Sequence, residues 1–82
     1  MARVATVKEI LELIEAHDYR CALTGVELTT ENAALDHIVP VADGGGSEIE
    51  NLMPVHREVN RMKDQLSLED FRAWIGMAHA KL

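Results

Sequence analysis

The sequence predicts a small α+β fold in which two short strands and a helix are flanked by a helix at each end of the chain. Two short apolar runs, residues 33–39 and 49–55, surround a loop at 41–47 whose three consecutive glycines cannot sustain a helix or strand well. Apolar residues at helical spacing occur before, just after and well beyond these runs. A chain of 82 residues that is 48% hydrophobic suits one globular domain spanning 1–82.

A first helix is expected from about Val7 to His17. Thr6 and Glu9 have the spacing of a capping box, in which the threonine hydroxyl and the glutamate carboxylate each accept a backbone hydrogen bond. We expect an apolar stripe on this helix to pack against the rest of the domain; it consists of Val7, Ile10, Leu11 and Ile14.

The run at 33–39 is expected to be a strand, although it contains Asp36 and His37. Neighbouring side chains of a regular strand point to opposite faces, so these two can serve one site only if the strand twists or ends there. Pro40 directly after Val39 fits such an ending. The alternative for His37 is a histidine whose hydrogen bonds are satisfied within the core.

A second helix should follow the strand at 49–55, because apolar residues recur there at helical spacing. Its buried stripe would turn Asn60 toward the strand that holds Asp36. The stripe consists of Val55, Val59, Met62 and Leu66.

A last helix is expected over about 67–80, with Ser67 as its N-cap. We expect Trp74 to pack in the core, with base stacking as the alternative. The apolar side of this helix consists of Leu68, Phe71, Trp74, Ile75 and Ala78.

The chemistry of the chain is concentrated around Asp36 and His37. A carboxylate such as Asp36 and an amide oxygen such as that of Asn60 are ligands that suit Mg²⁺. The neighbouring imidazole of His37 can take a proton from water. Basic residues near Asn60 can hold phosphates; these are Arg57, Arg61 and Lys63. Together they are the parts of a one-metal phosphodiesterase.

These residues resemble the motif of the HNH endonucleases, which are ββα-metal nucleases. The matching segments are 36–40, 44–46, 49–52 and 60–63, and the resemblance covers 19 to about 64. Asn51 and Asn60 are nine positions apart, as in the variant whose last motif residue is asparagine. The resemblance implies a ββα-metal core within the α+β fold.

The resemblance also implies a role for each motif residue. Asp36 and Asn60 would hold one Mg²⁺ or Mn²⁺ ion, and His37 would take the proton of the attacking water. Asn51 would tie the glycine-rich loop together and orient His37. The basic residues are candidate phosphate contacts, or are only solvated; they are Arg57, Arg61 and Lys63.

We expect no structural zinc, although many relatives carry four zinc ligands around this core. The corresponding positions are Cys21, Thr24, His56 and Val59. Threonine and valine do not complete the four-ligand site that structural zinc requires. Cys21 is therefore expected to be a small buried residue, and His56 a surface or hydrogen-bonded one.

Charge and composition limit the cellular setting and the partners. A net charge of −6 counts against a general nucleic-acid binder, whereas the basic residues near the motif could still suit DNA. One cysteine excludes an internal disulfide and fits a reducing compartment. There is no apolar run of membrane-spanning length and no signal-peptide pattern, so we expect a cytoplasmic location and no membrane.

The sequence therefore predicts a metal-dependent endonuclease that hydrolyses DNA phosphodiester bonds and nicks as a monomer. The alternative is a binding module of the same fold with little activity, for which the acidic balance argues. A homodimer, or a larger assembly that supplies DNA affinity, remains open. An apolar surface on the last helix could form the dimer contact.

Overall fold

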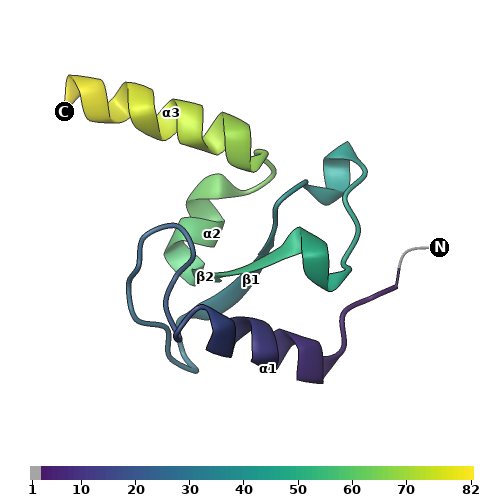
Figure 1. The fold of residues 1–82 in the computed structure, drawn as a ribbon. Helices are drawn as coiled ribbons and strands as arrows, with labels where there is room; N and C mark the ends of the chain where they lie inside the picture. The colour runs from purple at the N-terminus through teal and green to yellow at the C-terminus, as the bar shows by residue number, and fades with distance from the viewer. Residues whose placement is uncertain (1–2) are drawn as a thin grey trace.

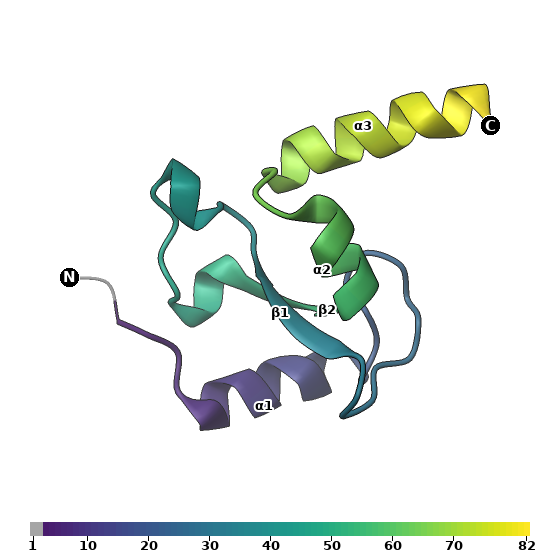
Figure 2. The ribbon, with the colours of Figure 1, turned by 180° about the vertical axis from the view of Figure 1, so that it is seen from behind.

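A computed structural model of the chain describes residues 3–82, so the first two residues of the expected domain lie outside the described part. Three helices and a two-stranded antiparallel sheet make up the fold, and the predicted α+β class is confirmed (Figure 1). Helix α1 and helix α3 lie at opposite ends of the molecule in both views (Figure 2). None of the helices in 3–82 is long and apolar enough to cross a membrane.

The sheet is a hairpin of β1 (Ala33–His37) and β2 (Leu52–His56), joined by the glycine-rich loop. Both strands differ from the expected ranges. β1 ends at His37, two residues before Val39, and the segment Ile49–Asn51 is a 3-10 turn rather than the start of β2. The loop itself contains a second 3-10 turn at Val41–Asp43, directly after Pro40. Strand pairing therefore ends at His37 and Leu52, and the connecting loop begins directly after the motif pair Asp36 and His37.

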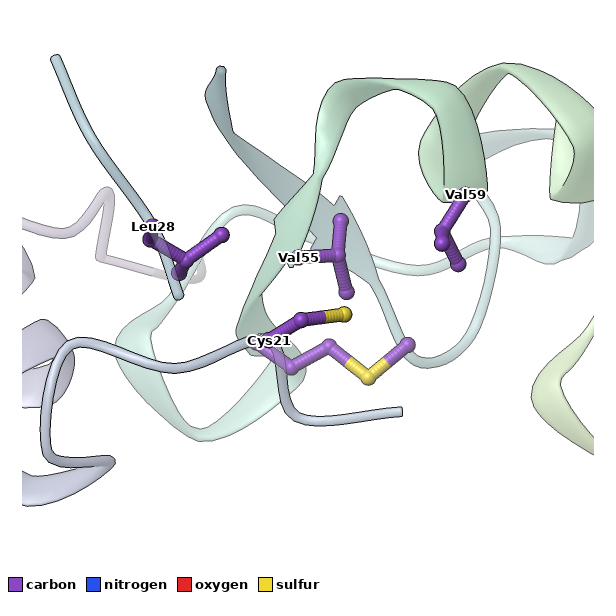
Figure 3. Packing of buried hydrophobic residues seen from close by; sticks show 5 residues of the cluster. Cys21, Leu28, Val55 and Val59 are labelled. Carbon is purple, nitrogen blue, oxygen red and sulfur yellow. The ribbon is translucent and has the colours of Figure 1, made fainter. Parts of the chain in front are cut away.

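The buried core lies along β2, where four of the five residues are buried. Figure 3 shows the side chains of Cys21, Leu28 and Val59 grouped around Val55. Val55 is fully buried, and Met53 completes the cluster. The residues of this core come from the segment before β1, from β2 and from α2, so it fixes α2 against the hairpin.

Helix α1 (Val7–Ala16) begins with the predicted capping box. The Thr6 hydroxyl accepts from the Glu9 backbone, and the Glu9 carboxylate accepts from the Thr6 backbone. Hydrogen bonds from Arg3 and then from the Thr6 backbone lower the pKa of Glu9 to about 2. The expected apolar stripe is only partly correct: Val7 and Leu11 are exposed, and the half-buried face contains Ile10, Leu13 and Ile14.

Helix α2 (Arg57–Lys63) packs on both strands, and its buried residues are Val59 and Lys63. The expected stripe was wrong at Met62, whose side chain is 61% exposed. Val59 and Lys63 are four positions apart and therefore share one face of the helix. A lysine thus occupies the inward-facing position that periodicity had assigned to an apolar residue.

The hydrophobic residues of helix α3 (Leu68–Lys81) that pack against the core, among the residues that the structure describes, are Leu68 and Phe71, near its N-terminus. Beyond these residues the helix extends away from the rest of the molecule (Figures 1 and 2). The expected burial of Trp74 was wrong, since its side chain is 60% exposed. The physical reason is the projection of the helix, because Phe71 is the last residue of α3 that packs against the core cluster among residues 3–82.

Candidate active site

One cavity of about 350 Å³ brings the motif residues together at the end of the hairpin. Asp36 and His37 reach it from β1, and Asn60 reaches it from α2. The remaining lining residues come from β1 and the turn after it, and from α2 and the turn after it; they are Leu35, Pro40, Val41, Arg61, Asp64 and Gln65. Residues separated by more than 20 positions in the sequence therefore share one concave surface.

The end of β1 allows Asp36 and His37 to serve the same cavity. Asp36 is only 5% exposed, and its Oδ1 accepts a hydrogen bond from the His37 backbone N–H at 2.8 Å. This bond folds the carboxylate back along the chain toward the next residue. The sequence-based condition that the strand must end at this pair is thus met by β1 ending at His37.

Lys63 forms a buried ion pair with Asp36. Its side chain is 0% exposed, and its Nζ lies 3.1 Å from Asp36 Oδ2. Nζ also donates to the backbone carbonyl of His37 at 3.0 Å. The phosphate contact expected of Lys63 does not fit this position, because a buried ammonium paired with a carboxylate is not presented to DNA. Its spacing of four from Val59 and the opposite charge of Asp36 were the sequence signals for this pairing.

The Asp36 carboxylate keeps one oxygen whose hydrogen-bonding capacity is unfilled. Oδ2 is buried and lies near Lys63 Nζ, yet the direction of approach does not make a hydrogen bond. The contact is therefore an ion pair, and the directed bond of Nζ goes to His37 O. A buried acceptor without a donor is a feature that a bound cation could satisfy.

The donor set at the cavity fits Mg²⁺ or Mn²⁺ better than a metal that needs many protein ligands. Within residues 3–82 no group of three or more His, Cys, Asp or Glu side chains could hold a metal. Mg²⁺ is usually bound through one or two carboxylates, with waters and substrate phosphates completing its shell. Asp36 and Asn60, which line the same cavity, are the residues that would hold such an ion.

Asn51 is a buried clamp for the glycine-rich loop. Its Oδ1 accepts from Val39 N at 2.9 Å, and its Nδ2 donates to Val39 O at 3.0 Å and to Gly46 O at 2.7 Å. A Cβ at Gly45 would collide with Val39 O and would lie 2.9 Å from Asn51 Nδ2. The clamp therefore requires glycine at this point, where the loop backbone passes against the segment after β1.

The His37 ring is held by Ser47 rather than by Asn51. His37 Nε2 lies 3.0 Å from Ser47 Oγ, and none of the hydrogen bonds of the Asn51 side chain reaches the ring. The expectation that Asn51 orients His37 can then operate only through the loop, because Asn51 binds Gly46, the residue before Ser47. Nothing in the sequence pattern singled out Ser47, since its contact arises from how the loop folds.

Asp64 is a second acidic residue that lines the cavity, and the sequence pattern did not identify it as a site residue. It ends α2 with a φ of 49°, a left-handed backbone conformation that is uncommon outside glycine. Its backbone N–H donates to Asn60 O at 2.9 Å. The turn at Asp64 thus ends the helix just after Lys63 and places an acidic residue beside Asn60.

Of the basic residues expected to contact phosphates, only Arg61 is exposed at the cavity. Its guanidinium lies 3.5 Å from Glu58 in an exposed pair, which water screens and which costs little to break. Arg57 lies at the other end of α2 and donates to Glu31 O at 3.2 Å. The structure therefore brings Arg61, but not Arg57, to the cavity.

The four positions compared above with a zinc site differ in burial, since Thr24 is exposed and His56 is half-buried. Cys21 and Val59 are both buried in the core cluster. Burial raises the pKa of the Cys21 thiol, but hydrogen bonds involving Thr24 and the His56 backbone outweigh it, so the net pKa is lowered. His56 caps α2, since its Nδ1 accepts from Glu58 N at 3.1 Å. The expectations of a buried Cys21 and a hydrogen-bonded His56 are confirmed.

A family model described as HNH endonuclease matches residues 19–65, which is more than half of the chain. The chain belongs to the HNH endonuclease family. The resemblance based on the motif residues is thereby confirmed, and the match ends one residue beyond the expected limit at 64. A search of curated proteins gave no match.

Membership of the HNH endonuclease family indicates the general function of the domain that contains this cavity. It indicates a nuclease or nucleic-acid-binding function, with DNA as the substrate implied by the family. HNH nucleases generally use a divalent metal ion. The motif residues Asp36, His37 and Asn60 line one cavity, which is the arrangement that such chemistry needs.

Proposed function

We propose that this HNH domain hydrolyses DNA phosphodiester bonds with the aid of one Mg²⁺ or Mn²⁺ ion. The observation that carries the proposal is the shared cavity, whose lining includes the histidine His37, the buried aspartate Asp36 and the asparagine Asn60. A hydrolase of this type needs a base for water, ligands for an ion and space for a phosphate. The cavity volume of about 350 Å³ leaves that space open.

Each motif residue has a distinct part in the proposed reaction. His37 takes a proton from the water that attacks phosphorus. Asp36 and Asn60 hold the ion, which when bound would stabilise the charge that develops on the phosphate and on the leaving oxygen. Arg61 offers an exposed guanidinium to a phosphate oxygen at the rim. Asn51 keeps the loop in shape around the cavity through its three backbone hydrogen bonds.

The charge of the domain predicts weak binding to DNA. The net charge is −6, and one exposed arginine at the cavity offers few phosphate contacts. One cavity with one base attacks one phosphate per encounter, so we infer that a monomer nicks duplex DNA. Cutting both strands then requires rebinding or a second chain, and another chain could also supply DNA affinity.

The second candidate is a binding module that keeps the HNH fold without efficient cleavage. The observation in its favour is the ion pair between Lys63 and Asp36, since a built-in cation already neutralises the carboxylate expected to bind metal. The acidic balance of the chain also favours a protein partner over DNA.

A plasmid assay separates the two functions. Supercoiled plasmid at low salt should give open circles before linear product with Mg²⁺ or Mn²⁺, and no product with EDTA. Raising the salt should slow nicking because few phosphate contacts hold the DNA. A chain that leaves the plasmid supercoiled with either ion would support the binding module. Linear product without earlier open circles, at concentrations where sedimentation shows monomer, would contradict nicking by one chain.

Replacing Asn60 with alanine should weaken Mn²⁺ binding while leaving the fold intact. The Asn60 side chain makes no hydrogen bond within residues 3–82, so its loss leaves no buried group unpaired. Asp36→Ala is a poorer test because it also leaves the buried Lys63 ammonium without its carboxylate partner. Calorimetric titration with Mn²⁺ measures the effect, with Thr30→Ala, at an exposed residue away from the cavity, as a control. Equal affinity in the wild type and Asn60→Ala would remove Asn60 from the metal site.

A further inference from the structure

The hydrogen bond between His37 and Ser47 bears on which nitrogen of His37 can act as the base. Nε2 lies 3.0 Å from Ser47 Oγ, and both residues are half-buried. A hydroxyl can donate or accept, so the bond can form with either neutral tautomer of the imidazole. The two tautomers differ in which nitrogen keeps a lone pair, and therefore in whether the ring can accept a proton from water.

Only one tautomer leaves His37 able to act as a base while this bond is made. If the Ser47 hydroxyl donates to Nε2, the ring proton is on Nδ1 and neither nitrogen has a free lone pair. If Nε2–H donates to Ser47 Oγ, the lone pair of Nδ1 stays available, because no hydrogen bond within residues 3–82 engages Nδ1. When Nδ1 then accepts a water proton, the imidazolium keeps its Nε2–H bond to Ser47.

Ser47 is fixed from two sides, so its hydroxyl has a defined position. The carbonyl of the preceding Gly46 accepts from Asn51 Nδ2 at 2.7 Å. The carbonyl of Ser47 itself accepts from the backbone N–H of Ala5 at 2.9 Å. The segment before α1 and the Asn51 clamp therefore hold the same short stretch of loop. A serine held in this way can impose an orientation on a neighbouring ring.

We propose that Ser47 is a positioning residue that holds the proton of neutral His37 on Nε2 and leaves Nδ1 to accept the proton of water. The catalytic part of this assignment rests on the proposed nuclease function. The bond itself fits either tautomer, so the choice of tautomer also rests on His37 acting as the base, but the tautomer can be measured without DNA or metal.

The tautomer is tested by NMR on the full chain labelled with ¹⁵N and free of metal. Long-range ¹H–¹⁵N correlations distinguish a protonated from an unprotonated ring nitrogen, and the His37 signals are those lost in His37→Ala. At about pH 8, a mildly alkaline condition that favours the neutral imidazole, the wild type should show a protonated Nε2 and an unprotonated Nδ1. Ser47→Ala should show a mixture of tautomers, and Ser47→Thr should keep the wild-type pattern.

A wild-type spectrum with the proton on Nδ1 would overturn the assignment, whether or not the variants fold. An unchanged tautomer in a folded Ser47→Ala would also overturn it. Circular dichroism establishes folding, and Thr30→Ala, an exposed hydroxyl in the loop before β1, serves as the matched control.

The catalytic part is tested by nicking kinetics on the same variants. Ser47→Ala should lower kcat by roughly 10- to 100-fold with KM unchanged, and Ser47→Thr should restore it. An unchanged kcat in Ser47→Ala would overturn the catalytic role. A wild type that does not nick would refute the nuclease function, whereas the NMR result would still decide the role of Ser47 in holding the ring.

Discussion

Replacing His37 with alanine should lower the rate of plasmid nicking by about 10²–10⁴, the usual effect of removing a general base. The imidazole lines the cavity beside the two proposed metal-binding side chains. Its only side-chain hydrogen bond in residues 3–82 is to Ser47, so its removal leaves just one half-buried hydroxyl without its partner. The fold and the affinity for Mn²⁺ should therefore change little. The measurement is the initial rate of open-circle formation at saturating Mg²⁺.

A matched control is available in His79, an exposed histidine near the end of α3. His79→Ala should nick at the wild-type rate. If His37→Ala also nicks at that rate, with circular dichroism and Mn²⁺ titration unchanged, then His37 is not the base. If His37→Ala loses Mn²⁺ binding together with activity, the imidazole is a metal ligand instead.

Replacing Lys63 with methionine should lower the free energy of unfolding by about 3–5 kcal/mol, the typical cost of removing one partner of a buried ion pair. Methionine keeps most of the side-chain length but leaves Asp36 as a buried carboxylate with no cation. It also removes the hydrogen bond to His37 O. Small domains have about 5–15 kcal/mol of stability in total, so this loss would be a large share of it. Urea denaturation followed by circular dichroism gives the value.

A second substitution separates the charge effect from lost packing. Asp36→Asn in the Lys63→Met background removes the unpaired carboxylate charge. The amide oxygen of the new asparagine can still accept from the His37 backbone N–H, as Asp36 Oδ1 does in the wild type. Part of the lost stability should return, and the double-mutant cycle gives the coupling. Lys81→Met, at an exposed lysine, should be nearly neutral. A loss below 1 kcal/mol in Lys63→Met would show that the ion pair does not hold α2 to β1.

The local patterns of the sequence predicted the arrangement of the motif well. The pair at Asp36 and His37 could serve one site only where the strand twists or ends, and β1 ends there. Helical spacing placed Asn60 on the face of α2 that turns toward β1, and it shares the cavity with Asp36. These outcomes depend on short-range geometry, which composition and spacing describe directly.

The errors arose where a side chain's surroundings depend on distant parts of the chain. Periodicity favoured Met62 as the buried residue because it is apolar, whereas the inward position belongs to Lys63, which the carboxylate of Asp36 compensates. The hydrogen bond between Ser47 and His37 likewise depends on the folded loop, held by Asn51. Sequence spacing carries no signal for the contact between Ser47 and His37, because each partner alone is an ordinary polar residue.

The exposure of Trp74 determines how this domain can be observed in solution. It is the only tryptophan of the chain, and it follows Phe71, the last residue of α3 that packs against the core among residues 3–82. Because its indole is already in contact with water in the folded state, intrinsic fluorescence should change little when the core unfolds. The same emission should shift toward the blue when another molecule covers α3. Fluorescence thus becomes a reporter of association, while the loss of structure must be followed by other means.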